Sequence, residues 1–225
     1  MIVRIANGLK CNDSAQIDEL IQLANEERRK KHPRPKELPP SHLAGVCRVS
    51  TGNSRIDSFK ALTDKARSHL VIMGIGMTNL AKDALPRLHE IGAKVPIHFL
   101  MLDPKVLETE LDFSKKLETF LDFPDFTANA RQAYRILRAF CVEWNAQPRH
   151  KHRMQFRVYN TIPTMSMVMI DPSLDSGEIE FEFFLYQSGE FRPRITVIKL
   201  RDNESLFNLL KDKFELLWKR SKRVV

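Results

Sequence analysis

The sequence predicts an α/β fold with a mixed, largely parallel sheet that is flanked by helices and preceded by an N-terminal helical extension. Three observations predict it. Apolar runs of strand length alternate with stretches of helical periodicity along most of the chain. The first two such runs are separated by one helix and short connections, which is typical of a parallel strand–helix–strand unit. Before this alternation begins, a helical pattern leads into a proline-rich stretch.

The N-terminal extension has two parts. Residues 13–31 place apolar side chains such as Ile17, Leu20 and Ala24 at helical spacing and end in a basic run, which suits a helix C-terminus. The segment that follows, HPRPKELPPSH, has four prolines in eleven residues, and these oppose both a helix and a central strand. We therefore expect an N-terminal helix and proline-rich linker over 1–42 and the main domain over 43–225.

The main domain is predicted to begin with a helix and a parallel strand pair. A helix is expected over 56–67, and the apolar run HLVIMGIGM at 69–77 is expected to form a buried strand. A helix over 80–91, closed by Gly92 at the position after its end, leads to a second buried strand in KVPIHFLMLDP. Gly74 and Gly76 lack the third glycine of a dinucleotide-binding loop, so they predict a tight turn.

The second half is predicted to contain long helices and then four strands. Helical periodicity covers 106–120 and 126–144, with an interruption near Pro124. Strand-like segments follow at 153–160, 164–172, 178–186 and 194–200. The last element, over 204–221, is an amphipathic helix whose apolar face is expected to pack against the sheet.

Composition excludes several classes of protein. With 225 residues, 43% hydrophobic and 28% charged, the chain resembles a globular protein and not a disordered or fibrous one. Its longest apolar stretches reach about eight residues, far below the roughly 20 of a membrane span, and no secretory signal is visible, so we expect a cytoplasmic protein. The three cysteines are widely spaced and are expected to be reduced. The net charge of +8 favours anionic partners.

Four segments in sequence order resemble one half of the phospholipase D superfamily over residues 56–221. They are GIGMTNL at 74–80, EIGAKVPIHFLMLDP at 90–104, TMSMVMIDP at 164–172 and FNLLKDKFELLW at 207–218. The chain is most similar to the phospholipase-D-like modules attached to bacterial helix-turn-helix regulators and signalling proteins. These modules share Leu-Asp-Pro at 102–104, Pro-x-x-Ser at 163–166 and Phe-Glu-x-Leu-Trp at 214–218.

The resemblance also implies that the catalytic motif has degenerated. The superfamily uses His-x-Lys and then, after four intervening residues, Asp. The imidazole attacks phosphorus and the lysine stabilises charge on the oxygens. Counting back from Asp171 puts Thr164 at the histidine position and Ser166 at the lysine position. None of the seven histidines is followed two residues later by lysine. We therefore expect a module without phosphodiesterase chemistry.

The carboxyl ends of the strands predict the binding site, because ligands of parallel sheets bind there. The expected ligand-binding residues are Gly76, Thr78, Asn79, Asp103, Thr164, Ser166, Asp171, Tyr186, Ser188, Arg192 and Arg194. Arginine can hold phosphate or carboxylate with two hydrogen bonds. Asp103 and Asp171, each followed by proline, have an alternative interpretation as structural caps. We expect a small anionic ligand such as a nucleotide, and neither a cofactor nor a metal ion.

The leading hypothesis is a non-catalytic phospholipase-D-like sensor in bacterial regulation or defence. Because the complete enzymes join two halves, the resemblance implies a homodimer in which the crevices of Thr164 and Ser166 face each other. Two alternatives stay open. One is a divergent nuclease or phosphodiesterase; the other is a nucleic-acid-binding protein that uses a basic connector formed by Arg149, Lys151, Arg153 and Arg157.

Overall fold

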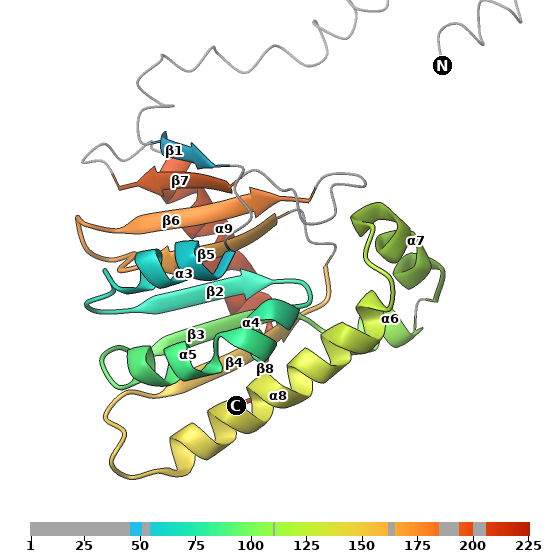
Figure 1. Cartoon of the computed structure of the whole chain (residues 1–225), viewed down its shortest axis with the longest axis horizontal. Helices are drawn as coiled ribbons and strands as arrows, with labels where there is room; N and C mark the ends of the chain where they lie inside the picture. Colours follow the sequence, from blue (N-terminus) through green and yellow to red (C-terminus); the bar gives the residue numbers. More distant parts are fainter. Residues whose placement is uncertain (1–45, 51–54, 110, 162–164, 185–193, 200–205) are drawn as a thin grey trace, which may run out of the picture. The chain divides into compact units, whose positions relative to one another are not determined.

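The computed structural model describes residues 46–50, 55–109, 111–161, 165–184, 194–199 and 206–225 (Figure 1). The predicted N-terminal helix and linker over 1–42 lie outside the described residues. Four of the predicted site residues also lie outside them, namely Thr164, Tyr186, Ser188 and Arg192.

Among the described residues, eight strands form one sheet in the order β1-β7-β6-β5-β2-β3-β4-β8. The strands are β1 (Val46–Ser50), β2 (Leu70–Gly74), β3 (Ile97–Leu102), β4 (Met154–Tyr159), β5 (Met165–Ile170), β6 (Glu178–Phe183), β7 (Arg194–Ile198) and β8 (Lys222–Arg223). The helices are α3 (Arg55–Thr63), α4 (Thr78–Asp83), α5 (Leu85–Gly92), α6 (Pro104–Thr109), α7 (Leu111–Leu121), α8 (Phe126–Ala146) and α9 (Leu206–Arg220). The predicted strands of the main domain are therefore present, together with β1 and β8, which the sequence patterns did not indicate.

The sheet is mixed, and the prediction that it is largely parallel is wrong. Only two of its seven described pairings, β2–β3 and β3–β4, are parallel. A parallel pair needs a crossover of about a dozen residues, and helices supply one on each side of β3. Residues 171–177, which join β5 to β6, are too few for such a crossover, so these strands pair as antiparallel neighbours.

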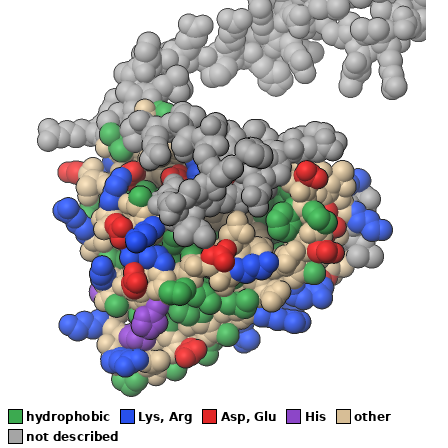
Figure 2. All heavy atoms as spheres, viewed as in Figure 1, with side chains coloured by type: hydrophobic (Ala, Val, Ile, Leu, Met, Phe, Trp, Pro, Cys, Tyr) green, Lys and Arg blue, Asp and Glu red, His purple; other side chains and the backbone are tan. Residues whose placement is uncertain are grey.

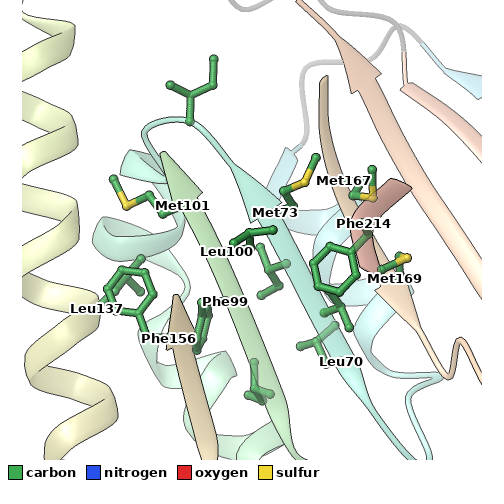
Figure 3. Close-up of a cluster of buried hydrophobic side chains, with 14 of the residues drawn as sticks. Leu70, Met73, Phe99, Leu100, Met101, Leu137, Phe156, Met167, Met169 and Phe214 are labelled. Carbon is green, nitrogen blue, oxygen red and sulfur yellow. The ribbon is translucent and has the colours of Figure 1, made fainter. Parts of the chain in front are cut away.

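Helices cover both faces of the sheet. In Figure 1, α3, α4, α5 and α8 lie over one face and α9 lies behind the other. Phe207, Leu210 and Phe214 of α9 are buried, which confirms the predicted amphipathic helix. Figure 3 shows Phe214 of α9 against the methionines of the central strands, with Met169 and Met73 nearby. Within the described residues, the structure contains no helix of the length and apolar character that a membrane span requires.

The helix predicted over 80–91 is divided in two. Pro86 lies in the first turn of α5, and α4 ends at Asp83, so that Ala84 lies between the two helices. Proline has no backbone N–H and cannot continue a helix from the preceding turn, which explains the break. Gly92 does not have the predicted role at the position after the helix, because it is the last residue of α5. A Cβ atom there would lie 3.0 Å from Cζ2 of Trp144, so glycine is needed for close packing.

Candidate functional site

A cavity of about 230 Å³ lies where β2 ends and α4 begins. Its walls come from β2 and the loop after it, from α3, α4 and the junction of α7 with α8, and from β5, β6 and β7. Five of the residues predicted from the sequence line it, namely Gly76, Thr78, Asn79, Ser166 and Arg194. The structure therefore brings together residues from positions 76 to 194 of the chain at one site.

The loop between β2 and α4 is shaped by close packing. Gly76 is buried, and a Cβ atom there would lie only 2.8 Å from Cε2 of Phe126. Glycine thus allows the ring of the first residue of α8 to reach the cavity wall. Met77 follows with a φ angle of 47°, in the left-handed region, and its carbonyl oxygen accepts a hydrogen bond from the N–H of Ala81. The loop folds back and places Thr78 and Asn79 at the cavity.

One wall of the cavity carries a row of polar side chains across three strands. Ser166 of β5 pairs with Glu182 of β6, and Glu182 pairs with Arg194 of β7. In an antiparallel sheet, directly paired residues project to the same face, so the three side chains form one continuous row. Glu180 lies two residues before Glu182 on the same face of β6 and also lines the cavity. We call Ser166, Glu180, Glu182 and Arg194 the polar row.

The polar row is largely buried and contains opposite charges. The Ser166 hydroxyl donates a hydrogen bond of 2.9 Å to Oε1 of Glu182. The Arg194 side chain is 9% exposed, and its nitrogens lie 3.9 Å from an oxygen of Glu180 and 3.9 Å from an oxygen of Glu182. These separations allow electrostatic attraction but exceed hydrogen-bond length. The guanidinium is thus held between two carboxylates at the edge of the cavity.

The remaining walls are mainly apolar. Five phenylalanines line the cavity, namely Phe59, Phe123, Phe126, Phe181 and Phe184. The rings of Phe123 and Phe126 meet edge to face, with centroids 6.0 Å apart. A cavity with apolar walls and a few convergent polar groups is the usual form of a small-molecule site.

Sequence reasoning missed Glu180 and Glu182. Their strand reads EIEFEF, and such strict alternation usually marks one buried and one solvated face. The apolar residues Ile179 and Phe181 are buried as expected, but the glutamate face is covered as well. The basic Arg194 on the neighbouring strand was the available signal, since a buried strand that carries glutamate needs a cationic partner.

Asp171 lies at the far end of β5 from Ser166. Their separation of five positions corresponds to about 17 Å along a strand. The Asp171 carboxylate accepts hydrogen bonds from the backbone N–H groups of Arg67, Ser68 and His69 and from the Ser68 hydroxyl. Burial by itself raises the pKa of Asp171, but these hydrogen bonds outweigh it and hold the pKa below its usual value. The structure therefore gives Asp171 the structural role that the sequence left open.

Asp103 also has a structural role, because it caps the start of α6, and it does not line the cavity. Its Oδ1 accepts a hydrogen bond of 3.0 Å from the N–H of Lys105, at the start of α6. Its own N–H donates to the carbonyl oxygen of Tyr159, beside the end of β4. This arrangement matches the alternative in which Asp103 begins the helix that contains Pro104.

The basic connector is exposed over three of its four residues. Arg149, Lys151 and Arg153 are exposed, and Arg153 also donates a hydrogen bond to the carbonyl oxygen of Asn145. Arg157 donates to the carbonyl oxygen of Trp218, 2.9 Å away, and stacks over its ring. On the face shown in Figure 2, basic and acidic side chains are interspersed. The structure thus leaves Arg149, Lys151 and Arg153 as the solvent-facing part of the connector, while Arg157 is held against Trp218.

A second polar cluster lies near α9, away from the cavity. The ring of His98 stacks on Trp218, with centroids 4.7 Å apart, and meets the ring of His69 edge to face. Burial, together with the proximity of His69 and Arg157, lowers the pKa of His98 to about 3. Burial also lowers the pKa of His69, although Asp171 opposes this. Both imidazoles are therefore neutral near pH 7. Across the described part of the chain, no three His, Cys, Asp or Glu residues are grouped in a way that could hold a metal ion.

Two solved structures are among those weakly similar to this chain. No known protein family and no curated protein match the sequence. TrmBL2, an archaeal chromatin protein whose structure is described as showing a novel mode of DNA binding, is 14% identical, with a TM-score of 0.48 over 93% of this chain and 65% of that one. Phosphatidylserine synthase from Haemophilus influenzae Rd KW20 is 15% identical, with a TM-score of 0.48 over 78% of this chain and 39% of that one. The chain spans less than two thirds of either protein, and the phospholipase D resemblance stays a prediction.

Proposed function

We propose that residues 43–225 form a non-catalytic, phospholipase-D-like module that binds a small molecule in the cavity at the end of β2. The observation that carries this proposal is the meeting of five predicted site residues at one cavity, with apolar walls and a buried polar row. Pockets of this composition generally orient a ligand through a few polar contacts and gain affinity from apolar contact.

The polar row supports binding in preference to phosphodiester chemistry. By the superfamily register, Ser166 occupies the position of the catalytic lysine, and its hydroxyl is bonded to Glu182. A hydroxyl cannot supply the fixed positive charge that stabilises a transferring phosphoryl group. The sequence also has no histidine followed two residues later by lysine.

Three finer parts of the proposal depend on the resemblance and on Arg194. They are an anionic ligand such as a nucleotide, pairing of two copies through their Ser166 crevices, and a role in bacterial regulation or defence. By itself, a guanidinium such as that of Arg194 can bind an anionic group with two hydrogen bonds. Glu180 and Glu182 offset that charge, so the anionic part of a ligand fits best away from the two carboxylates.

Native mass spectrometry of the purified full chain tests the proposal. We expect the native protein to carry a small-molecule mass that is lost on denaturation, and to do so as a dimer. Ser166→Leu, which enlarges a side chain in the cavity wall, should lower the bound fraction at least tenfold. The exposed Ser173→Leu is the matched control and should leave it unchanged. An equal bound fraction in both variants would place the ligand outside this cavity and contradict the proposal; a bound monomer would contradict the dimer alone.

A further inference from the structure

The chemistry of the polar row narrows the class of ligand, given that the cavity binds a small molecule as proposed above. Among the described residues that line the cavity, the charged side chains are Glu180, Glu182 and Arg194. Their carboxylates are hydrogen-bond acceptors, and the guanidinium is a donor. The wall therefore offers acceptors and a donor side by side, at the end of an apolar chamber.

This arrangement disfavours a simple ion as the group that contacts the row. A net negative group placed against Arg194 would also lie close to the two carboxylates, which lie 3.9 Å from the same guanidinium. A net positive group would be attracted by the two carboxylates, but it would meet the guanidinium that already lies between them. Because like charges repel strongly where side chains are shielded from water, an uncharged group that carries both a donor and an acceptor fits best.

The apolar walls indicate a flat ring. Phe59, Phe126 and Phe184 reach the cavity from α3, from the start of α8 and from the residue after β6. Aromatic side chains stack on planar heterocycles in a way that tolerates many ring types. The volume of about 230 Å³ is below the roughly 300–1,000 Å³ of pockets that hold drug-sized molecules, so it suits one ring system.

We propose that the cavity holds an uncharged heteroaromatic ring of the nucleobase type. A ring N–H or amino group donates to a carboxylate of the polar row, and a ring carbonyl or nitrogen accepts from Arg194. If the ligand is a nucleotide, its sugar and phosphate then lie outside the chamber, beyond the two carboxylates.

Nuclear magnetic resonance of the full chain with ¹³C-labelled methionine methyl groups tests this inference. Met77 lines the cavity, whereas Met154 is buried elsewhere and serves as an internal control. Guanosine, adenosine, cytidine and uridine are titrated separately, because nucleosides carry no phosphate charge. Toluene is the apolar probe and benzoate the anionic one. We expect at least one nucleoside to shift the Met77 signal in a saturable manner, to leave Met154 unchanged and to bind more tightly than benzoate.

Three variants test the polar row. Glu182→Gln and Arg194→Lys should each weaken nucleoside binding tenfold or more, because each removes an acceptor or a planar donor from the row. Glu178→Gln is the matched control: Glu178 lies on the same strand and the same face but pairs with Lys65, 2.8 Å away, and does not line the cavity. It should change the affinity less than twofold. Toluene binding confirms that the cavity is intact in each variant.

The outcomes separate this inference from the proposed function. If toluene shifts Met77 but no nucleoside does, or if benzoate binds more tightly than every nucleoside, the inference is overturned while the cavity remains a binding site. An equal loss of affinity in Glu178→Gln and Glu182→Gln overturns the role of the polar row. If neither toluene nor any nucleoside shifts Met77, both the inference and the proposed function fail.

Discussion

Replacing Asp171 by asparagine should destabilise the fold by about 3 kcal/mol and leave the cavity unchanged. The Asp171 residue is 1% exposed, and its carboxylate accepts hydrogen bonds from three backbone N–H groups and one hydroxyl. A hydrogen bond to a charged group contributes about 1.5–3 kcal/mol. Asparagine keeps one acceptor oxygen but turns an NH₂ group toward N–H donors, so about two of the four bonds are lost. Asparagine also tolerates the φ angle of 49° at this position, so backbone strain adds little.

The pH dependence of this effect has a definite sign. The folded-state pKa of Asp171 lies below the unfolded value, so its carboxylate stabilises the fold above the unfolded pKa, and this contribution is lost as the pH falls through the folded pKa. Urea unfolding of both proteins at pH 7 and at decreasing pH measures the difference. It should be largest at pH 7 and shrink below about pH 4. A difference under about 0.5 kcal/mol at pH 7, typical of surface substitutions, or one that stays constant on acidification, would refute the structural role of Asp171.

Three further predictions concern other parts of the molecule. The pKa of His98 falls to about 3 on folding, so between pH 6.5 and about 3 the unfolded chain binds one more proton than the folded chain. The free energy of unfolding should therefore drop by about 1.4 kcal/mol for each pH unit by which the pH decreases within this range. Urea titrations of His98→Gln should show a flatter pH profile, and an identical profile would contradict this. Burial raises the pKa of Cys141 to about 12, so in a variant that keeps only this cysteine a thiol reagent should label it after unfolding and not before. If the chain binds duplex DNA through its basic connector, Arg149→Glu with Lys151→Glu should weaken binding and reduce the salt dependence measured by fluorescence anisotropy, whereas salt-independent binding would exclude this mode.

The sequence was sufficient for most of the elements but not for their pairing. Periodicity located β2, β3 and the helices around them, because these strands are buried on both faces and read as continuous apolar runs. The orientation of β5, β6 and β7 depends on connection length and on which neighbours the strands select, and neither has a periodic signature. The break at Pro86 was visible in the sequence, but the helical pattern on both sides concealed it.

The candidate site was predicted in part for a similar reason. Residues at the end of β2 could be placed because ligands bind at the carboxyl ends of parallel strands, and Gly76, Thr78 and Asn79 line the cavity. Asp171 was grouped with Ser166 by motif spacing, but five residues along a strand separate rather than join two side chains. Glu182 was missed because its one signal, the basic Arg194 on a nearby segment, becomes specific only when β6 is known to pair with both β5 and β7.

Along β6, core residues at odd-numbered positions alternate with cavity-lining residues at even-numbered positions. Ile179 and Phe181 are buried core residues. Glu180 and Glu182 project to the opposite face and line the cavity, which Phe181 also borders. If the cavity binds a ligand as proposed, ligand preference and folding stability are encoded in interleaved residues of one strand. Substitutions at the even positions would then change the ligand preference without repacking the core. A shift of β6 by one residue would exchange the two sets, and both binding and stability would be lost together.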